Sequence, residues 1–345
     1  MIVPLILLAV LAFIAAKPSK QVLLQSYCSV SQTRSIKGIF VITVFFSHFC
    51  PYVHLESWYD LPLRYYCSCF GQLMVAPFFF YSGYGIFESI KAKGPGYIQT
   101  FPRNRILKTL LHFDFAVCLF LLLDLLIGEH VSISRFVLSL TGWDSIGNSN
   151  WFIFAILCAY VSVYTAMVFF GENLSLSLLL VTALLLVYVV VISHFKELPW
   201  FDTVLAFPLG CLLSLHKAKF ESIMQGKRIA PIGALMCLFI LSVTQSGLFH
   251  GFIKSQIALL AFLYLLVFLS LHVRLENRIL NWFGTQVFWI YILQRIPMNL
   301  FSFLRLNEYN MYLYFVLCFS STLLLSSLIS RWSNRFDSVV VDSSN

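Results

Sequence analysis

The sequence predicts an all-α fold, a polytopic bundle of transmembrane helices. Of its 345 residues, 59% are hydrophobic and only 11% are charged, whereas soluble domains carry about 25% charged residues. Apolar runs long enough to cross about 30 Å of hydrocarbon recur along the whole chain. They do not alternate with the period of two that marks the strands of a membrane barrel. We therefore expect no soluble domain of useful size.

The first apolar run covers residues 2–16 and lacks a preceding basic region, which argues against a secretory signal. We interpret it as an extra transmembrane helix, with a cleaved or interfacial segment as the alternative. Residues 1–32 then combine this segment with a basic cytoplasmic loop, residues 33–332 form the transmembrane domain, and residues 333–345 form a short polar cytoplasmic tail.

Ten further apolar runs are expected to form the core helices. They fall near residues 35–53, 66–90, 109–128, 150–170, 174–194, 200–216, 229–247, 255–272, 283–303 and 311–330. If the loop at 17–34 is cytoplasmic, most of the 23 basic residues lie on that side, as the positive-inside rule requires, and the C-terminus is cytoplasmic. The net charge of +8 follows from these loops, and no basic stripe with interleaved aromatics indicates nucleic-acid binding.

The helix near residues 34–49 begins with Arg34 and Lys37 and reaches a single histidine, His48. In an α-helix, Lys37 and His48 lie roughly 16 Å apart along the axis and on nearly the same face. An ionisable residue this deep in an apolar helix is usually functional, so His48 is a candidate general base, with a packing hydrogen bond as the alternative. The two cations suit an anionic ligand that enters from the cytoplasm, or act as snorkelling anchors.

An aromatic helix follows, interrupted by Ser82 and Gly83. Such small residues allow a second helix or a ligand to approach closely. Ser82 is rejected as a nucleophile because no paired base and orienting acid lie nearby in sequence. The next loop is basic, which indicates either membrane anchoring or a phosphate clamp. Its cations are Lys91, Lys93, Arg103, Arg105 and Lys108.

Polar residues in later spans need internal partners. Trp151 opens a span on the outer side, where an aromatic belt alone would explain it. Gln286, Tyr291 and Gln294 share one late span. Asp114 and Asp124 are the other intramembrane charges, although the outer interface would explain Asp124.

The nine cysteines are scattered, and six of them are most simply small buried hydrophobes. Cys67 and Cys69 are a weak metal signal because no second Cys/His pair has zinc spacing. A Cys67–Cys69 or Cys50–Cys67 disulfide is an alternative if that end of the helix faces an oxidising compartment. We expect no metal.

Several short motifs occur in a characteristic order. They are Lys37-x10-His48, Phe78-Phe79-x-x-Ser82-Gly83-Tyr84, Arg105-Ile-Leu-Lys108, Trp151-Phe152, Phe207-Pro-Leu-Gly210 and Tyr291-Ile-Leu-Gln294. From about residue 33 to 330, this order resembles the membrane-bound acyltransferase 3 family of bacterial sugar and polysaccharide O-acyltransferases. The family has Arg at the position of Lys37, and Lys cannot form a bidentate fork. It usually has His at the position of Gln294, and Gln cannot act as a base.

The resemblance implies transfer of an acyl group, most often acetyl, from cytoplasmic acetyl-CoA to a hydroxyl of a surface polysaccharide or glycolipid precursor in the bacterial inner membrane. Acyl-CoA is then a substrate, and no bound cofactor is implied. His48 would be the general base or an acyl relay. The implied CoA- and substrate-binding residues are Lys37, Arg34, Arg103, Arg105, Lys108, Ser82, Gly83, Tyr84, Trp151, Tyr291 and Gln294.

The alternative function is a transporter or flippase for an anionic or lipid-linked sugar, with His48 as a proton relay. Such transporters often show paired repeats with Gly- or Pro-broken helices in both halves. No such symmetry is visible in the sequence, which argues against this alternative. Dependence on acetyl-CoA would separate the two functions.

Overall fold

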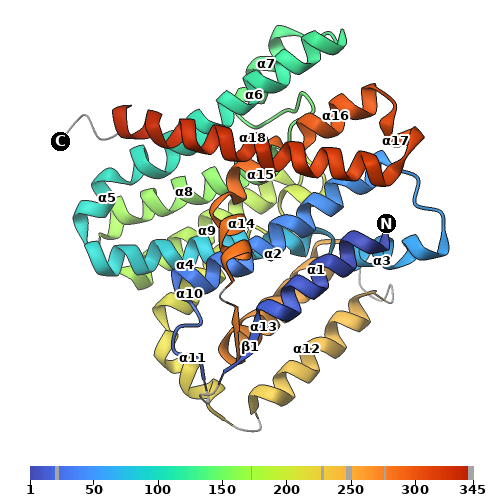
Figure 1. The fold of residues 1–345 in the computed structure, drawn as a ribbon. Helices are drawn as coiled ribbons and strands as arrows, with labels where there is room; N and C mark the ends of the chain where they lie inside the picture. Colours follow the sequence, from blue (N-terminus) through green and yellow to red (C-terminus); the bar gives the residue numbers. More distant parts are fainter. Residues whose placement is uncertain (20–22, 172, 227–228, 246–250, 276, 341–345) are drawn as a thin grey trace.

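The computed structural model describes residues 1–19, 23–171, 173–226, 229–245, 251–275 and 277–340 (Figure 1). The first half of the described chain forms α1 (Ile2–Ala15), β1 (Ala16–Pro18), α2 (Val30–Phe49), η1 (Cys50–Tyr52), η2 (Trp58–Asp60), α3 (Leu61–Phe70), η3 (Gly71–Val75), α4 (Ala76–Lys93), α5 (Pro95–Phe101), η4 (Pro102–Leu107), α6 (Lys108–Ile127), α7 (Ile133–Leu140) and α8 (Trp151–Phe170). The second half forms α9 (Leu174–Ile192), η5 (Leu198–Trp200), α10 (Ala206–Leu215), α11 (Lys217–Met224), α12 (Ile229–Gln245), α13 (Gly251–His272), β2 (Val273–Leu275), α14 (Arg278–Thr285), α15 (Val287–Leu293), α16 (Arg295–Phe303), α17 (Leu306–Tyr309) and α18 (Met311–Val340).

The predicted all-α multi-pass bundle is confirmed. Within the described residues, seven helical stretches are long and apolar enough to cross a membrane, or eight if the bent pair of α11 and α12 counts as one span. The seven are Val30–Tyr52, Trp58–Lys93, Pro95–Ile127, Trp151–Phe170, Leu174–Ile192, Gly251–His272 and Met311–Arg335.

Several of the predicted core spans are not continuous α-helices. The run at 66–90 crosses the end of α3, the turn η3 and most of α4. The run at 200–216 contains only α10, of ten residues, because a turn occupies residues 201–205. The run at 283–303 is divided into α14, α15 and α16, with breaks at Gln286 and Gln294. Hydropathy averaged over a whole run does not reveal such breaks, because a broken run can be as apolar on average as a continuous helix. The N-terminal run forms α1, a helix of 14 residues.

Glycines bring two pairs of helices into backbone contact. A Cβ at Gly83 of α4 would collide with the carbonyl oxygen of Phe207 in α10, and one at Gly210 would collide with the carbonyl oxygen of Phe80. Gly38 of α2 and Gly284 of α14 face carbonyl oxygens of the opposite helix in the same way. Small residues at such interfaces let transmembrane helices pack closely.

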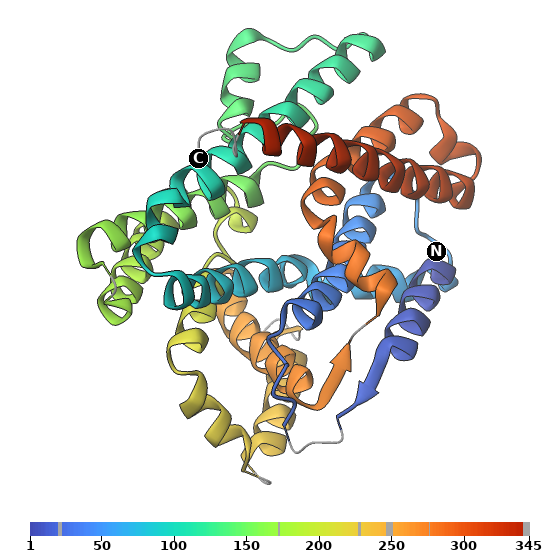
Figure 2. The same ribbon diagram turned by 60° about the vertical axis from the view of Figure 1, so that its left-hand side comes forward.

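A short antiparallel pair, β1 with β2, connects the N-terminal segment to the chain that follows α13 (Figure 2). The side chain of Gln32 in α2 extends this contact: its Nε2 donates to the Val273 carbonyl at 2.8 Å, and its Oε1 accepts from the Leu275 amide at 2.7 Å. Gln32 is fully buried. The first turn of α2 is thereby fixed in place, and the basic residues considered next lie in the turns that follow it.

Candidate functional site

A cavity of about 600 Å³ lies among α2, α4, η4, α6, α8, α14 and α15. Five residues singled out in the sequence line it: Arg34, Lys37, Ser82, Arg105 and Tyr291. They come from four separate elements, α2, α4, η4 and α15, so the fold brings together motifs that the sequence shows only in order.

The cations reach the cavity from two elements. Arg34 and Lys37 are one turn apart on α2, whose N-terminus is capped by the Ser29 side chain accepting from the Gln32 amide at 3.2 Å. Arg105 lies in the π-helical turn η4, and its Nε donates to the Tyr97 hydroxyl at 3.3 Å. A π-helical turn widens a helix locally and is frequent at functional sites.

The cavity combines positive charge with an otherwise neutral wall. Among the described residues that line it there is no Asp or Glu. The hydroxyls of Ser82 and Tyr160 lie 3.1 Å apart on its wall and add polar groups. Three cations without a lining carboxylate favour an anionic ligand, because charge-assisted hydrogen bonds to phosphate or carboxylate are the strong ones.

His48 lies in the last turn of α2, beside Gln294. Gln294 is fully buried, and its Nε2 donates to His48 Nδ1 at 2.8 Å and to the Tyr291 carbonyl at 2.9 Å. The rings of His48 and Tyr291 are 5.9 Å apart. His48 is not among the described residues that line the cavity. Tyr291 lines the cavity, and its ring is close to the His48 ring, so it lies between the two.

The Gln294 amide also sets the tautomer of His48. A carbonyl can only accept, so the amide must turn its Nε2 toward the Tyr291 carbonyl, and the same nitrogen then faces His48 Nδ1. In this geometry the ring proton of neutral His48 is on Nε2. The Oε1 of Gln294 is buried and has no partner among the described residues, so rotation of the amide would let Oε1 accept from Nδ1–H and free Nε2 as a base.

The acyltransferase domain family matches residues 34–331. The chain belongs to the acyltransferase 3 family. The resemblance drawn from the sequence motifs is therefore confirmed over nearly the whole chain, and the protein is a membrane acyltransferase. Neither a curated protein nor a solved structure matches the chain.

Other residues expected at the site of this acyltransferase lie away from the cavity. Gly83 packs against the backbone of α10, the alternative that its sequence context left open. Lys108 forms an ion pair with Asp337, with its Nζ 2.5 Å from the carboxylate oxygen. Trp151 begins α8 and packs edge-on against Phe152, with ring centroids 6.1 Å apart.

Tyr84 and Arg103 are likewise not among the described lining residues of the cavity. Tyr84 is close to Cys28 and Glu88, on the side of α4 that faces the loop before α2. Within that loop, burial raises the pKa of the Cys28 thiol to about 12, so this cysteine is a neutral packing residue. The contacts of Tyr84 therefore join α4 to the preceding loop.

Arg295 is a candidate residue that the sequence reading missed. It directly follows Gln294 and lies within electrostatic reach of His48, Tyr52 and Tyr291. Its Nε is buried and has no hydrogen-bond partner among the described residues. A half-buried cation within a membrane bundle, with one nitrogen left without a partner, is a candidate functional group. The sequence feature that could have identified Arg295 is its position directly after the Tyr291-to-Gln294 motif, inside an apolar run.

The cysteines form neither a metal site nor a disulfide in the described chain. No group of three or more His, Cys, Asp or Glu residues suited to a metal ion occurs among the described residues. Cys50, Cys67 and Cys69 take part in no disulfide among the described residues, and the sulfurs of Cys50 and Cys67 lie 3.5 Å apart.

Proposed function

We propose that this membrane acyltransferase transfers an acetyl group from cytoplasmic acetyl-CoA to a hydroxyl of a surface polysaccharide or glycolipid precursor in the bacterial inner membrane. The observation that carries the proposal is the cavity, with Arg34, Lys37 and Arg105 on its wall and Tyr291 between it and His48. The three cations are candidates for holding the phosphates of CoA. The charge pattern of the sequence, in which most basic residues fall in the loops expected to be cytoplasmic, supports entry of the donor from the cytoplasm and a cytoplasmic C-terminus.

His48 is the proposed proton acceptor. Its Nε2, once free, takes the proton of the acceptor hydroxyl, and the hydroxyl oxygen attacks the thioester carbonyl carbon. The carbon–sulfur bond breaks, an ester forms, and CoA leaves as a thiol with the proton returned by His48. An acyl relay on His48 would divide the same transfer into two steps.

The direct test compares surface glycans from wild-type cells and from cells that lack the gene. Proton NMR of the purified glycans measures their O-acetyl content. We expect the O-acetyl signals to disappear on deletion and to return with the wild-type gene at matched membrane expression. Unchanged acetylation after deletion would contradict the proposal for those glycans. Purified protein in vesicles should also release free CoA from acetyl-CoA only when an acceptor is present.

Lys37→Gln should weaken donor binding. Loss of a hydrogen bond to a charged group costs roughly 1.5–3 kcal/mol, so the KM for acetyl-CoA should rise about tenfold to a hundredfold, with a smaller effect on kcat. Lys37→Arg should retain binding because the charge remains. Lys93→Gln is the control, since Lys93 is exposed at the end of α4 and does not line the cavity. Equal KM values for Lys37→Gln and Lys93→Gln would remove Lys37 from the donor site.

Gln294→Leu should lower kcat and leave the KM for acetyl-CoA nearly unchanged. The variant removes both hydrogen bonds of the amide, frees the orientation of His48 and takes a donor from the Tyr291 carbonyl. A buried group left unpaired costs roughly 1–3 kcal/mol, which corresponds to a loss of about tenfold to a hundredfold. Gln286→Leu, at the other helix break, tests whether any Gln-to-Leu change there has the same effect. Steady-state kinetics on protein of verified monodispersity provide the readout.

A further inference from the structure

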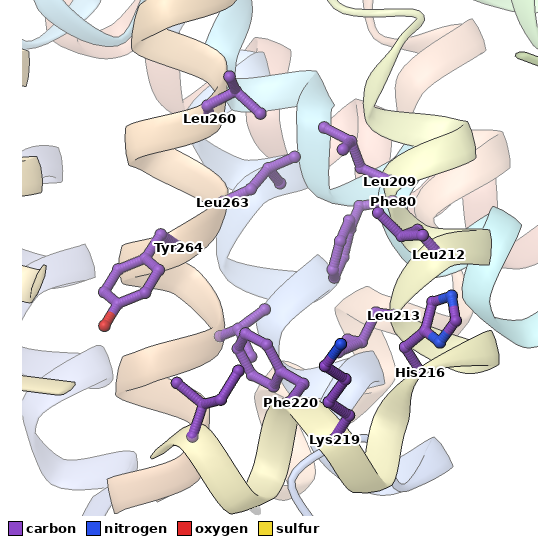
Figure 3. A pocket seen from close by; sticks show the side chains of 12 residues that line it. Phe80, Leu209, Leu212, Leu213, His216, Lys219, Phe220, Leu260, Leu263 and Tyr264 are labelled. Carbon is purple, nitrogen blue, oxygen red and sulfur yellow. The ribbon is translucent and has the colours of Figure 1, made fainter. Parts of the chain in front are cut away.

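A second hollow, separate from the cavity, is an apolar groove on the flank of the bundle. It has a volume of about 400 Å³ and lies among α4, α10, α11 and α13. Figure 3 shows Leu260 and Leu263 of α13 on one side, facing Leu209 and Leu212 of α10 on the other. Most of its lining is aliphatic or phenylalanine. The motifs of the proposed acyl transfer do not use this groove.

The groove faces the bilayer. Leu212 of α10 is 41% exposed and Leu260 of α13 is 55% exposed, although both belong to apolar helices, and Ile223 of α11 is 45% exposed. Exposed leucines at this depth contact lipid chains when the bundle lies in a membrane, since hydrocarbon solvates them as well as a protein core does. A groove of this kind is filled by an elongated apolar group.

Two basic side chains mark one end of the groove. Lys219 and His216 both line it, and both are exposed. Figure 3 shows the amine of Lys219 directed into the groove, beside Phe220 and Leu213. Among the described residues Lys219 takes part in no salt bridge, whereas its neighbour Lys217 is 3.9 Å from Glu221. An apolar channel with an unpaired ammonium at its end is complementary to an acyl chain attached to an anionic headgroup.

We propose that this groove is a binding site for an anionic phospholipid. One acyl chain lies along Leu209, Leu212, Leu260 and Leu263, and the phosphate lies at Lys219 with His216 as a second donor. Basic pockets between transmembrane helices are known to take anionic headgroups in this way. A packed apolar helix of a second copy would instead leave the Lys219 amine without an anion in an apolar contact.

The occupant is not the acceptor of the proposed reaction. Phe80 of α4 lines the groove, while the next two residues, Tyr81 and Ser82, line the cavity. The helix α4 therefore stands between the two spaces, and a lipid in the groove has no direct path to the cavity. The bound phospholipid lies against α4 and fills the space between α10 and α13, so it should stabilise the fold.

Native mass spectrometry of the purified full-length protein tests the site. Delipidated protein is titrated with phosphatidylglycerol or with phosphatidylcholine of the same chain length. Wild type should bind one phosphatidylglycerol about tenfold more tightly than phosphatidylcholine. Lys219→Gln should lose this preference while still binding both lipids weakly. Leu260→Trp should reduce the occupancy of both, because the indole fills the groove.

Lys254→Gln is the matched control: it makes the same charge change on α13, at the end away from the groove, and should behave as wild type. Equal affinity of wild type for the two lipids, or an unchanged preference in Lys219→Gln, would overturn the proposal. A dimer that Leu260→Trp abolishes would assign the groove to a second copy of the chain instead. These readouts are independent of acyl transfer, so a failed lipid test leaves the proposed function untouched, and the reverse also holds.

Discussion

His48→Ala should reduce acetyl transfer by about a thousandfold. General acid–base catalysis contributes roughly 10²–10⁴-fold, and alanine leaves no group near Gln294 that can accept a proton. The O-acetyl signals of surface glycans should match those of the deletion strain, and purified His48→Ala should retain acetyl-CoA binding because the three cations of the cavity are unchanged. Proton NMR of the glycans and release of CoA in vesicles measure the two effects.

His54→Ala is the control, because His54 is exposed in the loop after the same helix. Wild-type acetylation by His48→Ala at equal membrane expression would exclude the histidine from the reaction. The same pair of proteins separates the two roles of His48. Mass increase of the wild type by one acetyl group on exposure to acetyl-CoA, absent in His48→Ala, would assign the acyl relay, and its absence in both would favour the general base.

Gly210→Ala should destabilise the protein by about 3 kcal/mol. The added methyl group would collide with the Phe80 carbonyl oxygen, so α4 and α10 must separate, and overpacking of this kind lies at the upper end of the usual 1–3 kcal/mol range. The expected result is a lower Tm in thermal unfolding of the purified protein. Elsewhere in a helix the same change should stabilise by about 1 kcal/mol.

Gly96→Ala provides that contrast, since Gly96 is helical and a Cβ there meets nothing within 4 Å. Its Tm should be equal to or above that of the wild type. A Gly210→Ala protein as stable as Gly96→Ala would mean that α4 and α10 do not touch at this glycine.

The sequence was sufficient for the fold class and family because both depend on local patterns. The apolar run that carries His48 is recognisable in one stretch of the chain, and the helix α2 has nearly the expected bounds. The family motifs are likewise short, and their order is visible without any three-dimensional information. The breaks at Gln286 and Gln294 were not predicted, because average hydropathy over the run stays high although Gly284 and Thr285 precede the first break and Arg295 and Pro297 follow the second.

The composition of the site was harder to predict, since it depends on contacts between distant segments. Lys108 has the basic character expected of a phosphate ligand, but the ion pair with Asp337 follows only from the course of α18 across α6. In the sequence, Arg295 resembles a basic residue of an outer loop. In the structure, the break between α15 and α16 brings it within electrostatic reach of His48. Gly83 and Gly210 required knowledge of which helices are neighbours.

The pairing of β1 with β2 means that the domain recognised by family comparison is smaller than the unit that folds. The match begins at residue 34, but the residues before it supply a strand to β2, and the Ser19 and Leu24 amides bond to the carbonyls of His272 and Leu271 at 2.8 and 2.7 Å. A protein trimmed to the family boundary would lose those partners together with Gln32, whose side chain fixes the first turn of α2, directly before Arg34. The N-terminal segment therefore holds the start of α2 in place, and truncation there should damage catalysis even though Arg34, Lys37 and Arg105 remain.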